Sequence, residues 1–144
     1  MYANEKLIFA SGGRSNYRIP SMIVTNNGTV LAFCNDRKDT LSDAAQEASL
    51  ALCKKKPGED WGEVEELVFL EGWACGIGSA VYDNEIGKAF IFGGRNPISR
   101  DEFKNYTDEE KAEMAKQAAK MREEIRAKGM FSSYKLESTD DGET

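Results

Sequence analysis

A β-hairpin near the start of the chain is the feature that most constrains the fold. Residues 21–25 and 29–33 are rich in Val, Ile, Thr and Phe, which favour extended strands. Between the two runs stand Asn26, Asn27 and Gly28. An Asn-Gly pair tolerates the left-handed backbone that a tight reversal needs. The sequence therefore predicts two adjacent antiparallel strands.

Charged residues flank this hairpin on both sides. Arg18 precedes its first strand, and Arg37 and Asp43 follow its second. Because a hairpin brings its two open ends together, we expect a guanidinium and a carboxyl group to meet in one small volume. That arrangement suits recognition of an anionic ligand, since guanidinium groups bind carboxylates with two parallel hydrogen bonds.

The rest of the chain is dominated by further short strand patterns. Residues 46–53 and 64–70 follow the hairpin, separated by a Pro57-Gly58 turn. Four strands in a meander form one blade of a β-propeller. A second blade is predicted from strands at 79–82, 88–92 and 131–138, with glycines near 78 and at 93–94 marking strand ends. The sequence thus predicts an all-β fold.

One segment has a different character. Thr107 and Glu110 form a capping box, in which each side chain bonds a free amide of the first helical turn. Apolar residues then recur at helical spacing, and Gly129 is a suitable stop; the stripe is Met114, Ala118, Met121 and Ile125. We expect a helix over residues 107–128 that decorates the sheet surface. A lid over a pocket and a partner-binding helix are the alternatives.

Composition narrows the function classes. The net charge is −6 and the only run of basic residues is 54–56, which argues against nucleic-acid binding. No apolar stretch is long enough for a transmembrane segment, and no signal peptide is visible. We expect a cytoplasmic protein, or a secreted one whose signal lies outside this chain. The three cysteines lack a CxxC spacing and there is no His, so a His-containing zinc site and a Cys-His pair are excluded.

Two motifs together resemble the sialidase (neuraminidase) family. The first is Tyr-Arg-Ile-Pro at positions 17–20, followed by the hairpin, by Asp36-Arg37 and by Asp43. The second is Ser-x-Asp-x-Gly-x-Thr at positions 138–144, the Asp box that punctuates such propellers, after which a Trp is expected. A degenerate box, which keeps Gly58 and Trp61, stands at 54–61.

The resemblance implies a six-bladed β-propeller of which about two blades are present. Blade 1 spans about 17–70 and blade 2 about 77–144, with the helical insertion at about 107–128. The chain would then be the amino-terminal part of a longer enzyme. The implied activity is that of a retaining exo-α-sialidase, which releases terminal sialic acid from glycoproteins, glycolipids and oligosaccharides with no metal or other cofactor.

The resemblance also implies roles for four residues. Arg18 would bind the carboxylate of sialic acid, and Arg37 would line the sugar pocket. Asp43 would be the catalytic acid/base, with Asp39 as a nearby alternative. Asp36 would either orient Arg37 or contact the sugar. A family carboxylate that contacts the sugar would fall near residues 77–78, where this chain has Ile and Gly.

Part of the family's machinery has no counterpart in these residues. Sialidases use a Tyr nucleophile with a Glu partner and two further arginines, all from later blades, so we expect the 144 residues alone to be inactive. Two alternatives remain: a non-catalytic Asp-box propeller that binds sugar or protein, and a propeller hydrolase that acts on another acidic sugar.

Overall fold

The computed structural model describes residues 6–39, 47–70, 73–97 and 132–144, together with positions 107, 109, 112, 113, 116, 120, 123, 124 and 127. Its described residues form an all-β structure of one open sheet. The strands are β1 (Ser15–Val24), β2 (Val30–Lys38), β3 (Ala48–Lys55), β4 (Val64–Val68), β5 (Trp73–Asp83), β6 (Lys88–Pro97) and β7 (Ser132–Ser138).

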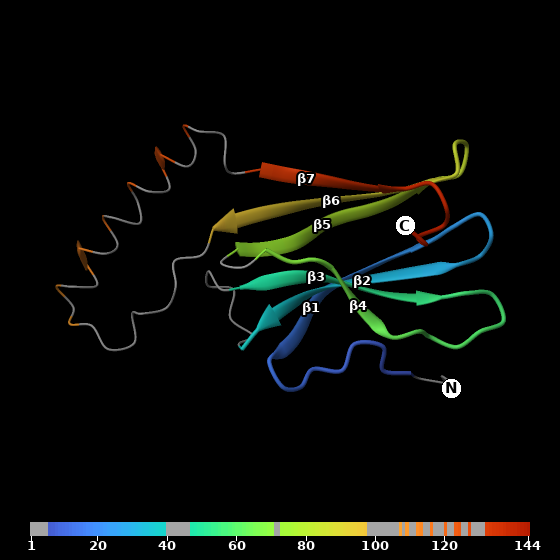
Figure 1. Cartoon of the computed structure of the whole chain (residues 1–144), viewed down its shortest axis with the longest axis horizontal. Helices are drawn as coiled ribbons and strands as arrows, with labels where there is room; N and C mark the ends of the chain where they lie inside the picture. Colours follow the sequence, from blue (N-terminus) through green and yellow to red (C-terminus); the bar gives the residue numbers. More distant parts are fainter. Residues whose placement is uncertain are drawn as a thin grey trace.

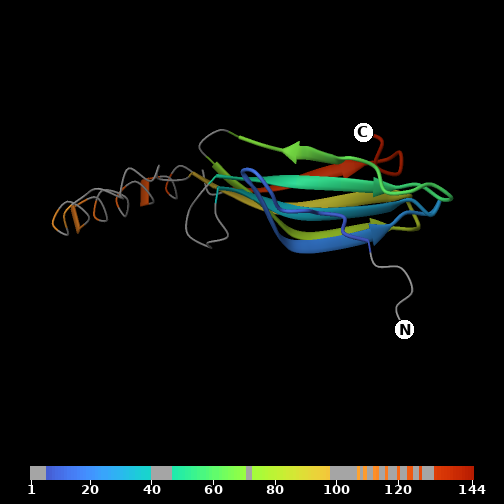
Figure 2. The same ribbon diagram turned by 90° about the horizontal axis from the view of Figure 1, so that it is seen from below.

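The sheet consists of two antiparallel meanders. The first meander is β1–β4 and the second is β5–β7 (Figure 1). The two are joined where Ala48 of β3 pairs with Ala74 of β5 in parallel. Seen from below, β1 and β4 lie on opposite sides of the layered strands (Figure 2), as expected for the outer members of the first meander.

Apolar side chains from both meanders form one core. The cluster draws on β2, β3, β5 and β6, and its buried members are Leu31, Phe33, Leu50, Leu52, Ile77, Ala89 and Ile91. The residues of β2 that enter this core are two apart, so they lie on one face of the strand. That face of the first meander is therefore the one that packs against the second.

The predicted hairpin is present. The Thr25 amide donates to the Thr29 carbonyl (3.0 Å), and Gly28 has a φ of 86°, a value that glycine adopts without steric cost. Both strands are longer than predicted, because the ladder continues through polar residues as far as Ser15 opposite Lys38.

The strand ends predicted at glycines were wrong. β5 begins at Trp73 rather than near 78, and β6 runs through Gly93 and Gly94 to Pro97. Gly76 pairs with Gly94 and Ile77 with Gly93 in the middle of the ladder. A Cβ at Gly93 would overlap the Tyr134 ring and the Gly76 carbonyl. Gly93 therefore allows close approach between elements, and neither Gly93 nor Gly94 ends the strand.

The remaining elements agree with the sequence apart from their bounds. Strands predicted at 46–53, 64–70 and 131–138 correspond to β3, β4 and β7. Of the predicted helix at 107–128, the described positions from 109 to 127 are helical, and all of them are exposed. The other positions of that segment lie outside the described residues.

Candidate functional site

The two predicted arginines lie on one face of the β1–β2 pair. Arg18 is directly opposite Asn35, and Asn16 is directly opposite Arg37. Residues directly opposite each other in an antiparallel pair project to the same face, as do residues two apart in one strand. Arg18, Asn35 and Arg37 therefore share what we call the arginine face. All three are half-buried, and neither arginine is without a partner.

The backbone next to Arg18 is irregular. The register of β1 shifts between Arg18 and Ser21, and Ile19 has a φ of 60°, which is uncommon for a β-branched residue. The buried Cys34 thiol donates to the Arg18 carbonyl at 3.1 Å. Bulges of this kind bend a strand, and this one begins directly after Arg18.

Asp36 lies on the opposite face. It is only 5% exposed, and it accepts hydrogen bonds from Ser15 Oγ (2.9 Å), the Asn16 amide (3.2 Å) and Lys38 Nζ (2.6 Å). A buried carboxylate needs such partners, and here the protein supplies them. These bonds favour a structural role for Asp36 over contact with a sugar.

Of the two candidate acids, Asp43 lies outside the described residues and Asp39 is described. Asp39 forms a two-pronged ion pair with Arg14, at 2.9 Å to Nε and 2.8 Å to Nη2. The hydrogen bond from Arg14 lowers the pKa of Asp39. A carboxyl group held in its ionised form has no proton to give to a leaving group, so Asp39 is unsuited to the acid role.

Sequence reasoning missed a contact between the arginine face and the second meander. The Ile77 amide donates to Asn35 Oδ1 at 2.7 Å. The carbonyl of the same peptide group, that of Gly76, accepts from the Tyr134 hydroxyl at 3.0 Å. Alternation along β2 was the available signal for Asn35, since it stands two residues before Arg37; no local pattern indicates its partner.

Each of the three described tyrosines has a defined contact. The Tyr82 hydroxyl donates to Asp141 Oδ1 (3.1 Å). Tyr134 donates to Gly76, and burial raises its pKa to about 12, which opposes formation of the phenolate. Tyr17 stacks at a tilt on Phe9, with ring centroids 5.3 Å apart. Tyr106 lies outside the described residues.

The Asp-box motif forms a closed turn. Asp140 accepts hydrogen bonds from Ser138 Oγ (2.8 Å), the Thr144 amide (2.9 Å) and the Thr144 hydroxyl. These bonds, that of the Thr144 hydroxyl first, lower the pKa of Asp140 to about 2. Gly142, at a φ of 88°, lies against Leu31, where an added Cβ would come within 2.7 Å of the leucine. The turn that follows β7 therefore packs against β2 through the contact of Gly142 with Leu31.

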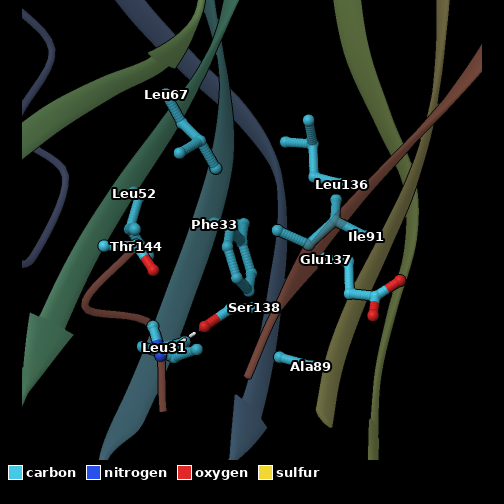
Figure 3. Close-up of a pocket in the computed structure, with 11 residues that line it drawn as sticks. Leu31, Phe33, Leu52, Leu67, Ala89, Ile91, Leu136, Glu137, Ser138 and Thr144 are labelled. Atoms are coloured by element: carbon cyan, nitrogen blue, oxygen red, sulfur yellow. Dashed lines mark hydrogen bonds between the residues drawn. The ribbon is translucent and has the colours of Figure 1, made fainter. Parts of the chain in front are cut away.

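A cavity of about 200 Å³ lies between the two meanders beside this turn. Figure 3 shows Phe33 and Ile91 pointing into it from β2 and β6. Its lining is mostly aliphatic, with Leu31 at one end. Leu31 and Arg37 are separated along β2 by roughly 20 Å at the usual rise per residue. The cavity is on the same face of β2 as Asn35 and Arg37 but toward the other end of the strand, and its lining includes no cation to attract an anionic sugar.

Neither the models of protein families nor the curated proteins include a match to the chain. Across the described residues, no helix has the length and apolar character needed to cross a bilayer. The same residues contain no group of three or more Cys, Asp or Glu side chains placed to hold a metal ion.

Proposed function

We propose that this chain supplies the first part of an exo-α-sialidase. The observation that carries the proposal is the shared face of Arg18 and Arg37, at the open end of the hairpin, with Asp43 six residues after Arg37 in the sequence. A sialic acid has a carboxylate beside its anomeric carbon, and two guanidinium groups on one face match that charge.

The proposed architecture is a β-propeller in which the first and second meanders are neighbouring blades. Two features support it. Each meander is an antiparallel unit of consecutive strands, as blades are. The closed Asp-box turn at 138–144 joins one meander to the other through Gly142 and Leu31, which is a position between blades in this proposal.

In the proposed mechanism, Arg18 binds the sugar carboxylate and Arg37 lines the pocket. Asp43 protonates the leaving oxygen and later activates water, as the acid/base of a retaining glycosidase does. The Tyr–Glu pair and two further arginines lie outside these 144 residues. Burial of Tyr134, which opposes formation of its phenolate, supports that division. Tyr82 lies five residues beyond Ile77 in β5, roughly 17 Å along the strand from the residue that contacts Asn35.

A non-catalytic Asp-box propeller that binds an acidic sugar is the second candidate. The arginine face would serve this function too, because holding an acidic sugar needs guanidinium groups and no nucleophile. Turnover separates the two: a sialidase releases sialic acid from a fluorogenic sialoside, whereas a binding protein only retains the sugar.

The test uses the protein produced from its whole gene. We expect Arg18→Leu to abolish binding of the unsaturated analogue of sialic acid, measured by calorimetry. We expect Asp43→Ala to retain that binding and to lose most turnover, by about 10²–10⁴-fold for a general acid/base. Lys6→Met, which removes an exposed cation paired with Asp60, is the control for lost charge. Normal affinity in Arg18→Leu refutes the carboxylate role, and unchanged turnover in Asp43→Ala refutes the acid/base role.

A further inference from the structure

The amide of Asn35 occupies a defined place on the arginine face. Asn35 lies directly opposite Arg18 in the ladder and two positions before Arg37 in β2. It is half-buried, and the ladder places its Cα beside that of Arg18.

The contact with the second meander fixes which way this amide points. A backbone N–H is a donor and pairs only with the carbonyl oxygen of an Asn side chain. Because the Ile77 amide lies 2.7 Å from Asn35 Oδ1, the NH₂ group must occupy the other branch. Within the described part of the chain, that NH₂ group has no hydrogen-bond acceptor.

The peptide group between Gly76 and Ile77, which bonds Asn35, also accepts a hydrogen bond from a second side chain. Tyr134 donates to the Gly76 carbonyl at 3.0 Å, so side chains bond both polar atoms of the 76–77 peptide. Gly76 also makes room for the amide, because a Cβ there would lie 3.0 Å from Asn35 Nδ2. Residues from three strands thus support one NH₂ group.

We propose that Asn35 contacts the ligand, donating a hydrogen bond from Nδ2 to the carboxylate of the acidic sugar that Arg18 binds. This inference rests on the proposed function and deepens it. The amide adds a neutral donor to the face that carries the two arginines, so it favours a planar carboxylate with more than one acceptor oxygen. A sugar-contacting carboxylate of the sialidase family would fall near residues 77–78, where this chain has Ile and Gly. In this proposal the NH₂ group of Asn35 is the polar group that contacts the ligand there.

Asn35→Asp tests this role in the protein from the whole gene. The substituted side chain keeps an oxygen for the Ile77 amide, loses the donor and places a negative charge against the ligand. We expect the affinity for the unsaturated sialic-acid analogue at pH 7 to fall about tenfold or more, in line with a lost charge-assisted hydrogen bond. Part of the loss should return toward pH 4.5, where the introduced carboxyl begins to be protonated.

Asn26→Asp is the matched control. It makes the same change of charge in the hairpin turn, where the Asn26 amide donates only to the Asn84 carbonyl, and we expect its affinity to equal that of the unmodified protein. Gly76→Ala is a second variant that leaves Asn35 in place and crowds its NH₂ group. We expect a several-fold loss of affinity from it, even if Asn35→Asp fails to fold.

The outcomes separate the inference from the proposed function. If the unmodified protein binds the analogue and both Asn35→Asp and Gly76→Ala bind equally well, the role of Asn35 is refuted and the sialidase proposal stands. If Asn35→Asp folds and its loss of affinity is the same at pH 7 and pH 4.5, the amide acts only on structure and the inference fails. If the unmodified protein binds no sialic acid, both proposals fail.

Discussion

Neighbouring glycines in β6 provide the sharpest test of how the two meanders fit together. Gly93 is buried and Gly94, the next residue in the same strand, is exposed. A Cβ at Gly93 would overlap the Tyr134 ring and the Gly76 carbonyl, whereas a Cβ at Gly94 would meet no heavy atom within 4 Å. Neither glycine has a positive φ, so Ala changes only the space that the residue fills.

The expected cost of Gly93→Ala follows from those contacts. Overfilling a packed site costs about 1–3 kcal/mol, and the Gly76 carbonyl is backbone and cannot rotate away. Displacing Tyr134 also breaks its hydrogen bond to Gly76, worth about 1 kcal/mol. We therefore expect the free energy of unfolding to fall by roughly 2–4 kcal/mol. Gly94→Ala should leave it unchanged or raise it by less than about 1 kcal/mol.

Urea unfolding followed by circular dichroism measures the difference. With a slope of about 1.5 kcal/mol/M, Gly93→Ala should lower the midpoint by roughly 1–3 M relative to Gly94→Ala. Equal midpoints for the two variants, at unchanged slopes, would refute the close approach of Gly93, Tyr134 and Gly76.

Two further predictions concern titratable groups. Hydrogen bonding lowers the pKa of Asp140 from 3.8 to about 2, so the carboxylate stabilises the fold above pH 3.8, and that contribution is lost as the pH falls toward 2. We expect the thermal midpoint of Asp140→Asn to depend less on pH over that interval than that of the unmodified protein; parallel profiles would contradict this. The three cysteines are buried, and burial raises the pKa of Cys34 to about 11. We expect a thiol reagent at pH 8 to leave the native protein unlabelled while it titrates all three thiols in urea, and prompt labelling of the native protein would show that a thiol is accessible.

Local chemistry made several features predictable. The hairpin depends on Asn27 and Gly28, and the Asp-box turn is closed by bonds that span at most four residues. The pairing of the two strands placed Arg18 and Arg37 at the open end of the hairpin. Each of these features is determined within a few residues, so the sequence alone was sufficient to predict them.

Contacts between distant segments decided the rest. Gly78, Gly93 and Gly94 were predicted as strand ends, but the pairing of β5 with β6 keeps them inside strands. Asp36 became a buried ion-pair partner of Lys38 because Ser15 and Asn16 of β1 close over it.

The bond between Asn35 and Ile77 joins residues 42 positions apart. Such a contact forms only when two meanders pack face to face, and the packing depends on the summed fit of many side chains. No short sequence pattern can therefore predict which residues meet in that packing. The residue types and their spacing therefore determined which strands and turns form, and the tertiary structure decided which polar groups meet at the arginine face.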